Sequence, residues 1–334
     1  MPLPAVPVLG SSPPLFIVLN AGSGKSDTAE VRRTIEQACE AAGRRHRIFL
    51  IDGPGRIQAL AKEAVECAKA EKGIVVAAGG DGTINTVAQA TLGTGCVFGV
   101  LPQGTFNYFS RANGIPAETE AALKVLLEES PREVQVGLVN DRVFLVNASM
   151  GLYAELLEER EAVKREYGRS RAIAFGAALL MLFRGHRQWD LHLDSHGERR
   201  DIRTPTLFVG NNPLQLRQVG IEEAEQLEND RQLAAVALKP AGTFGLAMLL
   251  LRGMFGRMGG ADSVTSFAFE TLTVEPRQSS RAARSRRPKK VSRVKVATDG
   301  ELGWLDMPLV FRISPDPLWL IRPEIAPELE AAKK

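Results

Sequence analysis

The sequence predicts a two-domain α/β protein, with a parallel sheet flanked by helices in the first domain and an antiparallel β-sandwich in the second. Up to about residue 136, apolar strand-like runs alternate with helix-like runs. This alternation is typical of a parallel sheet that has helices on both faces. After about residue 140, short segments of alternating apolar and polar residues take over. Such segments favour an antiparallel sandwich.

The first predicted strand leads into a glycine-containing turn. The expected elements of this domain are, in order, 15–19, 28–42, 45–51, 56–70, 73–78, 84–91, 97–101 and 117–129. Strand 15–19 is followed by N-A-G-S-G-K-S, which is close to a phosphate-binding P-loop. The P-loop pattern requires a glycine where Leu19 stands. A P-loop NTPase is therefore disfavoured.

Strand 73–78 runs directly into G-G-D-G-T at residues 79–83, before the next helix. Glycines let the backbone N–H groups approach an anion, and a helix N-terminus attracts one. By itself, the pattern also fits an ordinary strand-to-helix turn in which Asp81 is the N-cap.

Strand 97–101 leads into a third polar turn, P-Q-G-T-F-N, at residues 102–107. In an open parallel sheet, the carboxyl ends of the strands share one edge. We therefore expect Asn20, Asp81 and Thr105 to line one crevice.

The second domain is predicted to contain strands 142–148, 189–193, 204–210, 233–238, 266–274, 293–298 and 309–313, with helices near 153–184 and 242–258. Strand 293–298 ends in D-G-E (299–301), although D-G is also a common hairpin turn. Four potential metal ligands alternate along one strand: Asp190, His192, Asp194 and His196. Apolar residues alternate with them, so we interpret this segment as a hairpin with a polar outer face.

The composition favours a soluble, cytoplasmic enzyme. The longest apolar run, 172–183, is shorter than the roughly 18 residues that a membrane span needs. Residues 1–14 lack the basic segment of a signal peptide. The three cysteines give no indication of disulfides or of a zinc site.

Positive charge is concentrated in residues 277–295, from Arg277 to Lys295, which hold nine Lys or Arg and no acid. The run could be a loop between two strands or a binding surface for anionic lipid headgroups. Nucleic acid is a weaker alternative, because the run lacks aromatic residues.

Taken together, four motifs resemble those of the diacylglycerol-kinase-like lipid kinases, which include bacterial lipid kinases and sphingosine and ceramide kinases. They are N-x-G-S-G-K, G-G-D-G-T-I-N, L-P-x-G-T-x-N-x-x-x-R and the late D-G-E, with a weaker echo in V-G-N-N at 209–212. The resemblance extends from about residue 15 to 323. NAD kinases share G-G-D-G-T, but the other motifs favour the lipid kinases.

The resemblance implies a Rossmann-like α/β domain with an NAD-kinase-like nucleotide site, formed by 15–138 with the tail 314–334. It also implies a β-sandwich lipid-substrate domain at 139–313, which leaves an N-terminal extension, 1–14, and a basic loop, 277–293. The implied reaction is transfer of the γ-phosphate of ATP, with Mg²⁺, to a lipid hydroxyl at the membrane surface; diacylglycerol is the default acceptor.

The resemblance assigns Glu301 as the general base and Asp81 as a catalytic residue that holds Mg²⁺, with a second Mg²⁺ site at Asp230. It implies that nine residues bind the nucleotide: Asn20, Ser23, Lys25, Gly79, Gly80, Gly82, Thr83, Thr105 and Asn107.

The chain also departs from the family pattern. Tyr108 and Gln135 replace two aspartates that many members have, and Arg231 replaces the glycine that follows the aspartate at 230. Two alternatives therefore stay open: a kinase for a soluble acceptor such as NAD, and a catalytically weak protein that binds nucleotide or lipid. The oligomeric state, a homodimer included, is also open.

Overall fold

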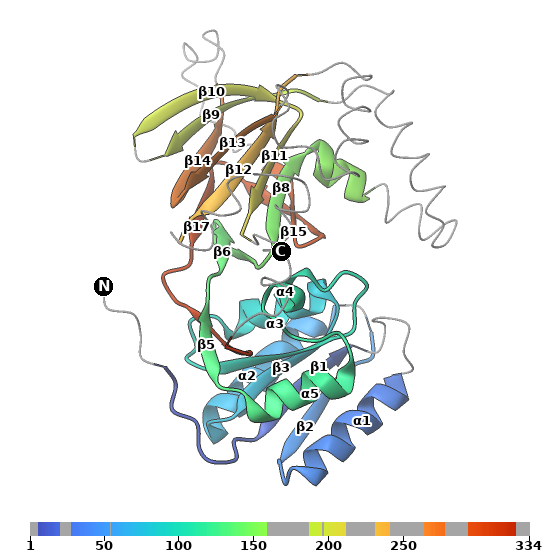
Figure 1. The fold of residues 1–334 in the computed structure, drawn as a ribbon. Helices are drawn as coiled ribbons and strands as arrows, with labels where there is room; N and C mark the ends of the chain where they lie inside the picture. The colour runs from blue at the N-terminus through green and yellow to red at the C-terminus, as the bar shows by residue number, and fades with distance from the viewer. Residues whose placement is uncertain are drawn as a thin grey trace, which may run out of the picture. The chain divides into compact units, whose positions relative to one another are not determined.

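The computed structural model describes residues 6–20, 28–53, 55–158, 187–195, 197–211, 231–240, 264–277 and 293–324. The chain divides into two compact units (Figure 1). The first consists of Met1–Val136 with Ser314–Lys334, and the second is Gly137–Ile313.

The first unit contains a six-stranded sheet with the order β2-β1-β3-β4-β18-β5. Its strands are β1 (Leu15–Asn20), β2 (His46–Ile51), β3 (Ile74–Gly79), β4 (Val97–Pro102), β5 (Pro131–Val134) and β18 (Leu318–Ile321). All neighbours pair in parallel except β5, which is antiparallel to β18. The strand β18, near the end of the chain, therefore lies inside a sheet that the N-terminal residues begin.

Helices cover both faces of this sheet (Figure 1). They are α1 (Thr28–Ala41), α2 (Ile57–Glu71), α3 (Asp81–Thr91), α4 (Tyr108–Ala112) and α5 (Thr119–Glu128). α1 contacts α5, whereas α2 contacts α3. α5 packs directly on β4, because the Leu126 side chain occupies the space in which a Cβ of Gly99 would lie. Strands β3 and β4 are buried along their whole length, as expected for strands covered on both faces.

The second unit consists of two six-stranded antiparallel sheets, with the orders β10-β9-β14-β17-β6-β7 and β13-β12-β11-β8-β15-β16. Side chains from both sheets form one core, which includes Leu193, Leu309 and Phe311 from the first and Met150 and Val296 from the second. The predicted fold class, a parallel α/β domain followed by an antiparallel β-sandwich, is confirmed.

The strands of the second unit are mostly short. They are β6 (Gly137–Val139), β7 (Arg142–Phe144), β8 (Asn147–Gly151), β9 (Trp189–Ser195), β10 (Glu198–Thr204), β11 (Thr206–Gly210), β12 (Leu233–Leu238), β13 (Val264–Phe269), β14 (Thr271–Pro276), β15 (Arg293–Thr298), β16 (Glu301–Asp306) and β17 (Leu309–Ile313).

Two predicted strands were wrong as single elements. The segment 266–274 is divided between β13 and β14, which belong to different sheets. The segment 142–148 is divided between β7 and β8, which also lie in different sheets. In both cases the chain crosses from one sheet to the other within one or two residues.

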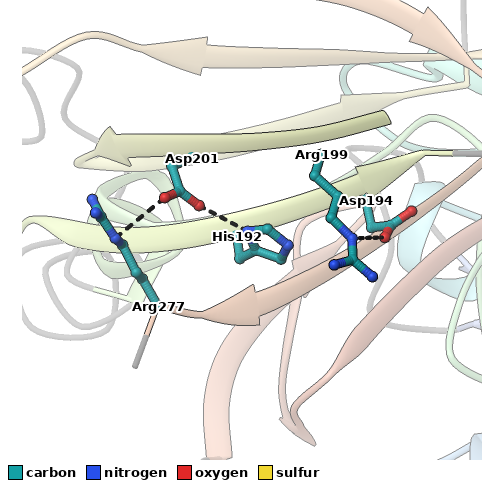
Figure 2. Close-up of polar contacts among 5 residues, drawn as sticks. All are labelled: His192, Asp194, Arg199, Asp201 and Arg277. Atoms are coloured by element: carbon teal, nitrogen blue, oxygen red, sulfur yellow. Dashed lines mark hydrogen bonds and ion pairs between the residues drawn. The ribbon is translucent and has the colours of Figure 1, made fainter. Parts of the chain in front are cut away.

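The hairpin of β9 and β10 has the predicted polar outer face (Figure 2). Leu191 and Leu193 are buried in the core. On the other face, His192 Nδ1 lies 2.7 Å from Asp201 Oδ1, and the Arg199 guanidinium pairs with Asp194 at 3.1 Å. Arg277 pairs with Asp201 at 3.3 Å. His192 and Asp194 therefore form polar pairs between the two strands. His196 lies outside the described residues.

Several predicted features fall outside the described residues, including most of the two predicted helices in 153–184 and 242–258 and the interior of the basic run. In the part of the chain that is described, no helix combines the length and the apolar character that crossing a membrane requires.

Candidate active site

Two glycine-containing turns and the end of β1 lie at one edge of the first unit's sheet. β1 ends at Asn20, β3 at Gly79 and β4 at Pro102, and these three strands are neighbours in parallel pairing. Their carboxyl ends therefore share an edge, which is the usual place for a ligand site in such a sheet.

A hydrogen bond joins the first turn to the second. Asn20 Nδ2 donates to Thr83 Oγ1 at 2.9 Å, across 63 residues of sequence. Thr83 is buried in the first turn of α3. A Cβ at Gly79 would lie 2.6 Å from the Cβ and Oγ1 of Thr83. Only glycine at position 79 leaves room for the threonine that Asn20 holds.

The second and third turns approach each other through two glycines. A Cβ built on Gly104 would lie 2.9 Å from Gly80 Cα, so the two backbones are in close contact. The Gln103 N–H donates to the Gly79 carbonyl at 2.8 Å, which continues the pairing of β3 and β4 beyond the strands. The end of β1, the second turn and the third turn are thus linked in this order.

Asn107 shapes the third turn from within. Its Oδ1 accepts a hydrogen bond from the Gly104 N–H at 2.9 Å, and its Nδ2 donates to the Gly104 carbonyl at 3.0 Å. Asn107 is buried and has a positive φ of 49°. The structure thus gives this side chain turn-closing contacts, while Thr105 in the same turn is exposed.

Helix α3 begins at Asp81, and its N-cap is Gly80. The interpretation of Asp81 as the N-cap was therefore wrong. The bond from Ile84 N to Gly80 O, at 3.0 Å, is the first of the helix, so the N–H groups of residues 81–83 are not used inside it. Asp81 is half-buried in this first turn, at the positive end of the helix dipole.

Tyr108, which replaces an aspartate of the family pattern, places an aromatic ring next to the third turn. Tyr108 is the first residue of α4, and its ring stacks on Phe106 with centroids 5.6 Å apart and an interplanar angle of 5°. Ser23, Lys25 and Asp230 lie outside the described residues.

The D-G-E motif belongs to the second unit, in the turn between β15 and β16. Thr298 and Glu301 face each other across the hairpin, and Asp299 and Gly300 both have positive φ, 49° and 89°. This is the geometry of a tight two-residue hairpin. Glu301 is exposed, whereas Asp299 is half-buried.

Sequence reasoning missed the contacts of Asp299. Its carboxylate accepts hydrogen bonds from three consecutive backbone N–H groups, those of Leu145 (2.7 Å), Val146 (2.8 Å) and Asn147 (2.9 Å). The same segment is bound from another side by Asn211, whose Nδ2 donates to the Leu145 carbonyl at 3.0 Å. The V-G-N-N echo in the sequence was the only signal that pointed to Asn211.

Arg142 lies beside the same turn. Its guanidinium occupies the space in which a Cβ of Gly303 would lie, and Nη2 is 3.5 Å from the Glu301 carbonyl oxygen. Burial lowers the pKa of Arg142, while the charges of Glu301 and Asp299 act in the opposite direction. The Arg142 guanidinium therefore interacts with both carboxylates of the D-G-E motif.

Comparisons with known proteins agree with this arrangement. Residues 14–139 match the family model of the diacylglycerol kinase catalytic domain. A protein of Chromohalobacter salexigens named "Probable lipid kinase YegS-like" is 35% identical over 158 residues, which cover 46% of this chain and 49% of that protein. A protein of the same name from Pseudomonas syringae is 32% identical over 178 residues, covering 52% and 53%. The chain thus matches about half the length of these relatives.

A crystal structure of a diacylglycerol kinase from Bacillus anthracis superposes with a TM-score of 0.65 at 16% identity. The superposition covers 94% of this chain and 98% of the other. At this identity the likeness shows a shared fold, and it extends over both units.

Proposed function

We propose that the protein transfers the γ-phosphate of ATP to the hydroxyl group of a lipid, because residues 14–139 match the family model of the diacylglycerol kinase catalytic domain and the chain shares the fold of a solved diacylglycerol kinase. The observation that carries the proposal is the meeting of the end of β1 and two glycine turns at one sheet edge. Backbone N–H groups and a helix N-terminus at such an edge suit the phosphates of a nucleotide.

In this proposal the residues of the first unit position the phosphates. The N-terminus of α3 and the turn residues Gly80 and Gly82 offer backbone N–H groups, and Asn20 fixes Thr83 beside them. Phosphoryl transfer requires mainly positioning and neutralisation of charge. Ser23, Lys25 and Thr105 stay predicted members of the same site.

Glu301 is the proposed general base. An exposed carboxylate at the end of a hairpin can accept the proton of the acceptor hydroxyl as its oxygen bonds to phosphorus. The bond between the γ-phosphorus and its bridging oxygen breaks at the same time, and ADP leaves. Glu301 therefore acts on the acceptor, and the glycine turns act on the donor.

Asp81 is the proposed ligand of Mg²⁺. This ion is usually held in kinases by one or two carboxylates together with phosphate oxygens and waters. A single half-buried carboxylate beside a phosphate-binding turn fits that mode. Among the described residues, no group of three or more His, Cys, Asp or Glu could hold a metal alone. When bound, the ion would neutralise charge on the transferred phosphate.

We propose that the acceptor is reached at the surface of an anionic membrane. The basic run ends on β15, where the Lys295 ammonium lies 5.2 Å from the ring centroid of Trp304. Trp304 is 56% exposed, and tryptophan is favoured at membrane interfaces. Lys295 and Arg293 also pair with Glu158 and Asp306. The surplus positive charge therefore comes from the rest of the run, at about 1 kcal/mol for each basic residue near such a surface.

The test is transfer of labelled γ-phosphate from ATP with Mg²⁺ into a total lipid extract. The wild-type protein is expected to label a lipid, and Glu301→Gln is expected to lower the rate of labelling by about 100- to 10,000-fold. Glu198→Gln is the matched control, because Glu198 is also exposed on a hairpin strand. Labelled phosphatidic acid as the product would identify diacylglycerol as the acceptor.

Two outcomes would contradict this proposal and favour another function. Label in a soluble product without lipid, such as phosphorylated NAD, would favour the soluble-acceptor kinase. ATP binding with no transfer to any acceptor would favour the catalytically weak binding protein, which the replacements at Tyr108 and Gln135 motivate.

A further inference from the structure

The Asp299 carboxylate is fully engaged inside the protein. Its Oδ1 accepts from the N–H groups of Val146 and Asn147, and its Oδ2 accepts from that of Leu145. In an ordinary D-G hairpin the aspartate only supports its own turn. Here it reaches a segment more than 150 residues earlier in the chain.

The segment 145–147 depends on these contacts for its backbone hydrogen bonds. Leu145 and Val146 are buried between β7 and β8, at the point where the chain changes sheets. Asp299 binds all three N–H groups of the segment, and the Asp299 N–H donates to the Asn147 carbonyl at 2.9 Å. Asn211 donates to the other two carbonyls, those of Leu145 at 3.0 Å and Val146 at 2.9 Å. Every backbone polar group of the segment is thus satisfied by one of two residues.

This arrangement separates the two carboxylates of the D-G-E motif. Asp299 holds the turn to a buried segment, while Glu301, two residues later, is exposed. Arg142 restrains the next part of the hairpin, because its guanidinium lies against Gly303. The backbone that carries Glu301 is therefore held on both sides.

We propose that Asp299 is a positioning residue for Glu301: by binding the N–H groups of Leu145, Val146 and Asn147, it fixes the hairpin turn from which the base acts. The inference rests on the proposed function of Glu301. It also implies that Asp299 neither binds a metal nor takes a proton during the reaction.

Hydrogen exchange tests the structural half of this proposal without any activity assay. In Asp299→Asn, the amides of 145–147 and of the turn at 299–301 should exchange at least about tenfold faster than in the wild type. Asp306→Asn, at the other end of the same hairpin, should leave them unchanged, because Asp306 pairs at the surface with Arg293. Unchanged exchange in Asp299→Asn would overturn the inference whether or not the protein is a kinase.

A double-mutant cycle tests the functional half. Asp299→Asn should lower kcat between about 10- and 100-fold, since small displacements of a catalytic group have effects of this size. In the Glu301→Gln background, the same change should alter the residual kcat less than about twofold. An equal loss in both backgrounds would mean that Asp299 acts on the reaction directly. No transfer by the wild type would instead reject the proposed function and leave the exchange experiment to decide.

Gly300→Ala provides a second variant if Asp299→Asn fails to fold. A Cβ at Gly300 meets no atom within 4 Å, so the substitution strains only the positive φ of 89°. It should displace the turn while every carboxylate is retained. We expect a loss of kcat that again disappears in the Glu301→Gln background, and an additive loss would contradict the proposal.

Discussion

Asn107 shows how one side chain determines the shape of the candidate site. Its two hydrogen bonds to Gly104 close the third turn, and that turn touches Gly80 of the second. Its backbone φ of 49° is in the left-handed region, which Asn and Gly tolerate better than other residues. The side chain and the backbone therefore both favour asparagine here.

Two substitutions at this position separate these contributions. Asn107→Ala should lower the free energy of unfolding by about 3 kcal/mol, because it loses two hydrogen bonds and strains the backbone. Asn107→Gly should lower it by about 2 kcal/mol, because glycine adopts the positive φ without strain. Urea denaturation of both variants measures the difference, and an alanine variant as stable as the glycine variant would contradict the role of the backbone.

At the scale of elements, two polar pairs in the hairpin of β9 and β10 make the stability of the folded state depend on pH. The hydrogen bond from His192 is the main cause that lowers the pKa of Asp201, and the bond from Arg199 is the main cause that lowers the pKa of Asp194. A carboxyl whose pKa is lowered by folding stabilises the native state above its unfolded pKa, about 3.9. This contribution is lost as the pH falls from that value through the lowered one.

His192→Ala should therefore raise the pKa of Asp201 toward its ordinary value. The stability of the folded state should then depend less on pH in the acid range. NMR titration of the carboxyl carbons measures the change. The pKa of Asp194 should move less, because the bond from Arg199, its largest cause, is retained and the charge of His192 is its smallest. A pKa of Asp201 that does not move would show that the bond to His192 is not formed in solution.

Sequence patterns predicted elements well where a turn residue bounds an apolar run. The predicted strands 233–238, 293–298 and 309–313 coincide with β12, β15 and β17. The segment 266–274 was misjudged because no Gly or Pro interrupts it; only a shift of the large apolar residues from odd to even positions, at Glu270 and Thr271, marks the point where the chain leaves one sheet for the other. Helix α3 begins three residues before the predicted start, because its first turn is polar and carries the glycine motif.

The candidate site was predictable in part for a similar reason. The glycine motifs follow apolar strands, so local sequence identifies them, and the parallel order of β1, β3 and β4 brings the ends of these strands together. The contacts of Asp299 could not be predicted, because D-G has the same appearance in any tight hairpin. Its partners at 145–147 are ordinary apolar and polar residues far away in the sequence.

At the scale of the whole molecule, the chain combines a proposed phosphate-binding edge in one unit with the D-G-E hairpin and the basic run in the other. A net charge of +3 understates this asymmetry, because nine of the 42 Lys and Arg residues lie in residues 277–295. Membrane association should therefore be electrostatic and should depend on salt.

The whole protein should co-sediment with vesicles that contain anionic lipid at low salt, and much less at about 0.5 M salt, where charges are screened within a few ångströms. Replacing Lys289 and Lys290 by Glu should weaken binding at least about tenfold. Matched charge reversals at Lys62 and Lys124, which are exposed on α2 and α5, should have little effect. Equal losses from both pairs would indicate that only the net charge matters and would contradict a localised membrane surface.

Calorimetric titration with ATP and Mg²⁺ tests most directly whether the glycine turns that follow β3 and β4, together with the end of β1, form a nucleotide phosphate site. The wild type should bind one nucleotide. Gly104→Ala should bind it at least about tenfold more weakly, because the added Cβ would lie 2.9 Å from Gly80 Cα and force the second and third turns apart. Gly53→Ala, whose Cβ meets no atom within 4 Å, should bind like the wild type. Failure of the wild type to bind ATP, or unchanged binding in Gly104→Ala, would contradict the account.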